Sequence, residues 1–215
     1  AFPSDRRWYP DPLTELTVFR LTNPAWSSYL PPASHHPAAR RGNFLLYGCD
    51  RTGKAQAFRM DLGSGESRQL TEMEALDAAS ITLHPDERSF FCFDGPVLKR
   101  VDLRNLRERV AYRVPPGWER CPGFSLSGDG RSAALAERRQ GGSRLQLVGT
   151  GGGGARTLAE ADGEIRDPLI RPGRQHQVLY RQGGDLWLVD PNGRNRRKLA
   201  LADGTAGPAL WHPGG

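Results

Sequence analysis

Arginine is the residue type in this sequence best suited to recognising a charged ligand. It carries most of the positive charge behind the net charge of +6, since the only lysines are Lys54, Lys99 and Lys198. A guanidinium presents a planar fork of N–H donors that can bind a carboxylate or a phosphate through two parallel hydrogen bonds. The charge therefore favours an acidic sugar or a nucleic acid as ligand. Because the chain has no basic stripe interleaved with aromatic residues and no known nucleic-acid motif, we expect no nucleic-acid binding.

The five histidines are candidates for metal binding or base catalysis, but their positions favour structural roles. His84 and His212 each precede a proline in a turn that recurs along the chain. His35 and His36 are adjacent in a loop, where two neighbouring imidazoles chelate a metal poorly without a third ligand. His176 is predicted to lie in an exposed turn. We therefore predict no metal ligand among them.

The cysteines point to buried free thiols. Cys49, Cys92 and Cys121 are an odd number and show no CxxC spacing. Cys49 and Cys92 fall in apolar strand patterns, where a thiol behaves as a small hydrophobic residue. All three are interpreted as structural, which mildly favours a reducing compartment.

The elements that must position these side chains belong to a unit of about forty residues that repeats four times and begins a fifth. One marker is a turn followed by an apolar strand, at His84–Asp86, Ser127–Gly130, Arg171–Gly173 and His212–Gly214. A second marker is a strand that ends in a turn at positions 61, 102, 149 and 190, which are 41, 47 and 41 residues apart. Short strands with a period of roughly 40–45 residues are typical of a β-propeller, one blade per repeat.

The predicted fold is all-β: a single β-propeller domain over residues 1–215, with about four four-stranded blades and the start of a fifth. Residues 1–35 form an N-terminal segment in which Thr17–Thr22 is a candidate ring-closing outer strand. The predicted blades cover residues 36–72, 79–115, 121–160 and 164–202, and residues 206–215 begin the next. A native chain that ends at Gly215 would leave open sheet edges and favour self-association; we expect a longer native chain.

The sequence also argues against a membrane protein. No stretch approaches the ~18 apolar residues that a membrane-spanning helix requires, and the first residues contain no apolar signal core. We predict a cytoplasmic or periplasmic protein without membrane contact.

With the repeat in place, several segments resemble the oligogalacturonate lyase family, a group of propellers related to TolB and WD40-like repeats. The resemblance covers most of the chain and is carried by Val18–Thr22, Met60–Leu62, Arg68–Glu72, Arg100–Leu103, Pro168–Pro172, Asp185–Asp190 and Trp211. It implies a seven-bladed propeller whose members cleave short pectin fragments by β-elimination at a manganese-containing site.

The resemblance also implies particular site residues. A family arginine that neutralises the substrate carboxylate is matched by Arg144, but the histidine that acts as base is replaced by Asp167. A carboxylate there would repel an anionic substrate unless Arg166 or a metal offset its charge. The first metal ligand corresponds to Pro208, which cannot ligate, so Mn²⁺ is expected only if the family activity is retained.

Three functions remain open at this point. The first is a divergent propeller, non-catalytic, that binds an acidic oligosaccharide or a protein partner, with Arg144 and Arg166 as substrate-binding residues. The alternative is an active oligogalacturonate lyase that uses Mn²⁺ and acts on pectin fragments. The second alternative is a TolB-like scaffold that binds proteins through the propeller face.

Overall fold

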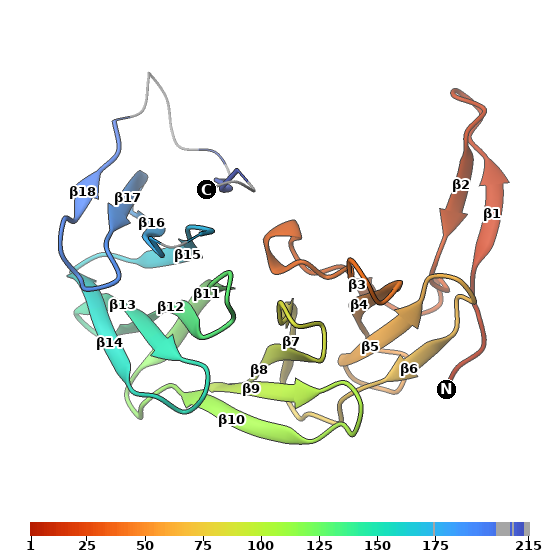
Figure 1. The fold of residues 1–215 in the computed structure, drawn as a ribbon, viewed down its shortest axis with the longest axis horizontal. Helices are drawn as coiled ribbons and strands as arrows, with labels where there is room; N and C mark the ends of the chain where they lie inside the picture. The colour runs from red at the N-terminus through yellow and green to blue at the C-terminus, as the bar shows by residue number, and fades with distance from the viewer. Residues whose placement is uncertain (174, 201–206, 208, 213–215) are drawn as a thin grey trace. The chain divides into compact units, whose positions relative to one another are not determined.

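The computed structural model describes residues 1–173, 175–200, 207 and 209–212, and over these residues the chain is built from short antiparallel strands. Four four-stranded sheets and a two-stranded hairpin follow one another along the chain (Figure 1). Within each four-stranded sheet the strands are hydrogen-bonded in chain order. The all-β fold with four blade-like sheets is therefore confirmed. None of the helical structure described is long and apolar enough to cross a membrane.

The contacts group the chain into two compact units. The first comprises Ala1–Gly95 with Val101–Arg107, and the second comprises Pro96–Arg100 with Glu108–Gly215. The first unit contains the hairpin, the first sheet and the first two strands of the second sheet: β1 (Arg7–Pro10), β2 (Thr17–Arg20), β3 (Ser28–Tyr29), η1 (Ala33–His35, a 3₁₀ turn), β4 (Phe44–Cys49), β5 (Gln56–Asp61), β6 (Ser67–Gln69), β7 (Leu76–Leu83) and β8 (Ser89–Asp94).

Strand β9 (Val97–Asp102) contributes residues to both units. The second unit then contains β10 (Glu108–Arg113) and the third and fourth sheets: β11 (Glu119–Leu126), β12 (Ser132–Arg139), β13 (Gly142–Gly149), β14 (Ala155–Ala161), β15 (Ile165–Ile170), β16 (Val178–Gln182), β17 (Asp185–Val189) and β18 (Arg197–Lys198). Arg144, Arg166 and Asp167, to which the sequence analysis gave possible functional roles, lie in this second unit.

The structure differs from the sequence-based expectation at the start of the first sheet and at residues 209–212. The first sheet begins with β3 at Ser28, earlier than the predicted start at residue 36, because β3 is a two-residue strand with no apolar run to reveal it. The strand at Thr17–Arg20 forms, but it pairs with β1 through the register Trp8 to Phe19; its ring-closing role stays a prediction. Residues 209–212 of the predicted fifth blade are not in a strand, and the rest of that segment, Gly207 apart, lies outside the described residues.

Two of the recurring turns are built in the same way. Asp61 and Asp102 each end a strand, and in each case one carboxylate oxygen accepts the backbone N–H groups two and three residues ahead, at 2.8–3.0 Å. The loops then close through a residue with positive φ, Gly65 in one and Leu106 in the other. An aspartate that hydrogen-bonds the backbone ahead of it is a standard way to initiate a tight turn.

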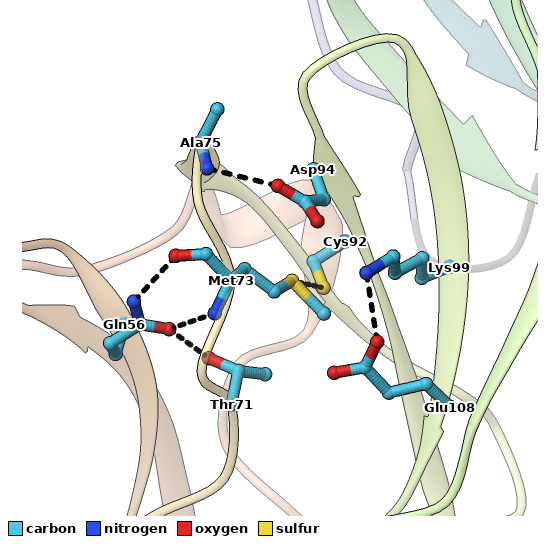
Figure 2. Close-up of polar contacts among 8 residues, drawn as sticks. All are labelled: Gln56, Thr71, Met73, Ala75, Cys92, Asp94, Lys99 and Glu108. Atoms are coloured by element: carbon cyan, nitrogen blue, oxygen red, sulfur yellow. Dashed lines mark hydrogen bonds and ion pairs between the residues drawn. The ribbon is translucent and has the colours of Figure 1, made fainter.

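In the first unit, a buried polar network ties β5 to the segment that leads into β7 (Figure 2). The Gln56 amide donates to the Met73 carbonyl at 2.8 Å and accepts from the Met73 N–H and the Thr71 hydroxyl at 2.9 and 2.8 Å. A buried amide with all of these bonds is stabilising, whereas an unsatisfied one is costly. The Met73 sulfur in turn lies 3.7 Å from Cys92 Sγ. Cys49, Cys92 and Cys121 are all buried and free, as predicted.

In the second unit, two buried serines join the third sheet to the innermost strand of the fourth. Ser125 Oγ accepts the Ile170 N–H at 2.8 Å. Ser143 Oγ accepts the Ile165 N–H at 2.9 Å and donates to the Gly163 carbonyl. Because the two bonds lie at opposite ends of β15, they hold the whole strand against the third sheet.

Replacing Ser125 with Ala should leave the Ile170 N–H buried without its acceptor and lower the free energy of unfolding by about 1–3 kcal/mol. Urea denaturation followed by circular dichroism measures the change. Ser28→Ala is the control, since its exposed hydroxyl makes only a 3.6 Å contact with the Cys49 sulfur. Equal stability of the two variants would contradict the bridging role of Ser125.

Candidate functional site

Backbone irregularities on two neighbouring inner strands shape the candidate site. On β15, Arg166 pairs with Arg181 and Leu169 pairs with Leu179, so an extra residue is accommodated at Asp167–Pro168. On β11, the register also shifts between Arg120 and Phe124. Such bulges re-aim side chains and are enriched next to active sites.

The two bulges meet where Gly123 of β11 approaches Asp167 of β15. Gly123 has φ +81°, and a Cβ added to it would lie 3.0 Å from Asp167 Cα and 3.1 Å from its Oδ1. Only glycine allows both this backbone conformation and this approach. Asp167 itself has φ +50°, an uncommon conformation for a residue with a side chain, which is often found at functional sites.

Asp167 lies beside two guanidinium groups. Its Oδ2 is 3.9 Å from Arg166 Nε and 3.7 Å from Arg181 Nε. The Asp167 and Arg166 side chains are 48% and 47% exposed, whereas the Arg181 side chain is 13% exposed. One carboxylate therefore faces two cations at a position that solvent can reach, and the group carries a net positive charge. We call Arg166, Asp167 and Arg181 the bulge site.

Arg144 lies in a different setting, which we call the Arg144 cluster: Tyr112, Trp118, Glu137 and Arg144. Both Nε and Nη2 of Arg144 lie 2.7 Å from Glu137 Oε2, and the Glu137 side chain is fully buried. The Tyr112 hydroxyl donates to the other carboxylate oxygen, Oε1, at 2.7 Å. The Trp118 ring centre lies 3.8 Å from Arg144 Cζ, a cation–π distance.

Strand pairing explains why Arg144 and the bulge site are apart. Glu137 pairs directly with Arg144, so the two side chains share a face of the third sheet, the face that Tyr112 of β10 meets. Their neighbours Ala136 and Leu145 point to the opposite face, into the apolar core shared with Ile165 of β15. Among the described residues, no hydrogen bond or ion pair joins Arg144 to Arg166 or Asp167.

The structure thus brings together some residues predicted from sequence and not others. Arg166 and Asp167 are adjacent as expected, and Arg181 joins them through the β15–β16 pairing, which the sequence analysis missed. Glu137 was missed too, although a signal existed. The two-residue loop Gln140-Gly141 joins β12 to β13 with Arg139 opposite Gly142, and this register places Glu137 opposite Arg144.

The described residues do not fit a manganese site. They contain no group of three or more His, Cys, Asp or Glu side chains that could hold a metal ion. The exposed carboxylate of the bulge site faces two guanidiniums, which repel a cation. Pro208, the residue at the expected first metal ligand, lies outside the described residues.

Four four-stranded antiparallel sheets, one for each repeat of the sequence, define the class as a β-propeller. No family model matches the chain. The oligogalacturonide lyase of Pectobacterium atrosepticum is 24% identical over 218 residues, which cover 89% of this chain and 56% of the lyase. A solved oligogalacturonate lyase in complex with manganese superposes with a TM-score of 0.85 at 25% identity, covering 92% of this chain and 60% of the lyase.

Within the propellers, the chain therefore resembles the oligogalacturonate lyases, as the sequence analysis proposed, and it spans just over half the length of the curated relative. TolB from Acinetobacter baumannii is a more distant neighbour in fold, with a TM-score of 0.60 at 20% identity over 88% of this chain and 47% of TolB.

Gly123→Ala should destabilise the protein by about 1–3 kcal/mol, because the new methyl group combines an unfavourable φ with a clash against Asp167. Gly141→Ala is a matched control: Gly141 has φ +89°, but nothing lies within 4 Å of its added Cβ. Urea denaturation of both variants separates the two effects. If Gly141→Ala costs as much as Gly123→Ala, the close approach of the bulges is not what requires glycine.

Alkaline pH should weaken the Arg144 cluster. Burial, and then the hydrogen bond to Glu137, raise the pKa of Tyr112 above its ordinary value. Its contribution to stability is therefore complete below pH ~10, the ordinary tyrosine pKa, and is lost as the pH rises further. The melting temperature of the wild type should fall more steeply above that pH than that of Tyr112→Phe. Some slope should remain in the variant, because burial also raises the pKa of Tyr47 and Tyr180. Identical slopes would contradict the assignment.

Proposed function

We propose that this chain is a divergent oligogalacturonate-lyase-like propeller that binds an acidic oligosaccharide without cleaving it. The observation that carries the proposal is the bulge site, where Arg166 and Arg181 lie within 4 Å of one half-exposed carboxylate. A uronate carboxylate approaching this group meets a net positive charge and N–H donors suited to bidentate binding. The likeness to oligogalacturonate lyases supports a uronate over a phosphate.

Each bulge-site residue has a role in this proposal. Arg166, about half exposed, attracts the ligand and pairs with its carboxylate. Arg181 is more buried and is anchored by a hydrogen bond to the Gly207 carbonyl, so it provides the more fixed of the two cations. Asp167 presents an acceptor for a sugar hydroxyl and limits the local charge, which favours a hydroxylated anion over a simple inorganic one.

The proposal of binding without cleavage rests on where the charges lie. Elimination beside a carboxylate requires a base and a cation that stabilises the developing negative charge. By resemblance the base position is Asp167 and the cation is Arg144, but Arg144 is paired with Glu137, and among the described residues no ion pair joins it to Asp167. An active lyase is the second candidate, favoured by the two guanidiniums that offset the charge of Asp167.

Isothermal titration calorimetry with trigalacturonate tests binding. Arg166→Ala and Arg181→Ala should each weaken affinity by about tenfold, the effect of losing one charge-assisted contact, and affinity should fall with added salt. Arg109→Ala, an exposed arginine of β10, should bind as the wild type does. An uncharged galactose trisaccharide should release no heat. Absence of heat with trigalacturonate would overturn the proposal and favour a TolB-like scaffold for protein partners.

An elimination assay separates the two candidates. The protein is incubated with unsaturated digalacturonate, with and without Mn²⁺, and the keto-uronate product is followed. We expect no turnover. Turnover that is abolished by Arg144→Ala or Asp167→Asn would replace the binding proposal with the lyase.

A further inference from the structure

The Glu137 carboxylate is fully buried, and it lies outside the bulge site proposed above to bind the ligand. It has no solvent exposure, and its two oxygens are shared between the Tyr112 hydroxyl and the Arg144 guanidinium. A buried ion pair is weak evidence for stability, because desolvation offsets its attraction and a well-packed apolar pair often serves the fold equally well. Another role for the carboxylate follows from which part of Arg144 it binds.

The carboxylate occupies one side of the guanidinium. Of its five N–H donors, Glu137 Oε2 engages the Nε–H and one donor on Nη2, both at 2.7 Å. The remaining donors lie along the edge formed by Nη1 and Nη2, an edge that has the geometry to bind a carboxylate bidentately, and the Tyr112 hydroxyl also interacts with this guanidinium. The Arg144 side chain is 19% exposed, so part of it remains open to solvent.

Trp118 lies against the same group. Its ring centre lies 3.8 Å from Arg144 Cζ, and Arg139 Cζ lies 4.5 Å from the same centre. The ring comes from the loop Val114–Trp118 between β10 and β11, where the Trp118 N–H bonds the Pro115 carbonyl. The carboxylate therefore restricts the rotation of the guanidinium, and the indole lies against it at a cation–π distance.

We infer that Glu137 is a positioning residue, which holds Arg144 so that its Nη1–Nη2 edge receives a carboxylate of the ligand. The inference goes beyond the proposed function, because it adds Arg144 as a second contact for the ligand outside the bulge site, and it rests on the proposed function for the identity of the ligand. It assigns Tyr112 a supporting part, since the phenol binds the oxygen of Glu137 that Arg144 leaves free. It also predicts that the orientation of Arg144, and not its charge alone, determines recognition.

The test compares Glu137→Ala with Glu137→Gln. Glutamine keeps an oxygen acceptor for Arg144, whereas alanine keeps none. Affinity for trigalacturonate should fall about tenfold in Glu137→Ala and in Arg144→Lys, which retains charge but loses the planar fork. Glu137→Gln should stay within about threefold of the wild type, because one hydrogen-bonded acceptor preserves the orientation. All titrations are run at a temperature where melting curves show each variant fully folded.

The matched control is Glu160→Gln. Glu160 pairs directly with Arg144 from the other side, on β14, and is exposed. Its substitution removes one negative charge from the same row without touching the Glu137 contact, so affinity should be unchanged or slightly higher. If Glu137→Ala binds as tightly as the wild type, Glu137 does not position Arg144. Equal losses in Glu137→Ala and Glu137→Gln would likewise overturn the inference, since they would follow from charge or folding alone.

A readout that does not depend on trigalacturonate separates this inference from the proposed function. The Nε–Hε signal of Arg144, assigned by its absence in Arg144→Lys, is followed in ¹⁵N–¹H spectra during titration with acetate. In the wild type and in Glu137→Gln, the proton of this group should exchange slowly with water and its signal should shift on titration. In Glu137→Ala, the proton should exchange rapidly and the signal should not shift. A shift without trigalacturonate binding would overturn the proposed ligand and leave the positioning role standing. If neither acetate nor trigalacturonate shifts the Arg144 signal of the wild type, the positioning role itself is overturned.

Discussion

A fully buried carboxylate is the constraint on which the site-bearing part of this chain depends. Glu137 has no contact with water, and an ion in that position must be compensated by donors placed around it. The compensation draws on three different segments: Tyr112 of β10 supplies a hydroxyl, Arg144 of β13 supplies a cation, and Trp118 of the intervening loop covers that cation. One side chain thereby fixes the contact between the third sheet and β10.

The opposite face of the same sheet is arranged by apolar packing. Because side chains alternate along a strand, the residues beside Glu137 and Arg144 point the other way, and small Ala134 and Ala136 allow Ile165 of β15 to pack closely. Ser125 and Ser143 then bond the backbone of β15 at its two ends. The bulge at Asp167 lies between these bonds, so its unusual backbone conformation is held by ordered neighbours on both sides.

The fold was largely predictable from the sequence, because residues with a known chemical role in turns recur at regular intervals along the chain. An aspartate that caps a turn, as Asp61 and Asp102 do, leaves a periodic mark that can be read without a structure. Two-residue strands leave none, which is why β3 was missed. The site was less predictable: Asp167 and Arg166 were found through the resemblance to a family, but Arg181 reaches them through a bulge that shifts the register. The pairing of Glu137 with Arg144 was derivable from the two-residue loop Gln140-Gly141. The burial of Glu137 was not derivable, since an isolated glutamate at the end of an apolar strand is usually exposed.

The chain and the oligogalacturonate lyases it resembles share a fold, and a fold supports many functions. What distinguishes this chain is the use of its arginines in two different ways. In the bulge site, two guanidiniums outnumber one carboxylate, an arrangement that attracts anions over a distance and affects mainly the rate of association. In the Arg144 cluster, charge is balanced and orientation is restricted, an arrangement that adds little long-range attraction and discriminates by shape. Taken together, the proposed function and the inferred role of Arg144 predict that a ligand with several carboxylates uses the bulge site to approach and the Arg144 cluster to be recognised, and that a single uronate gains only one of the two.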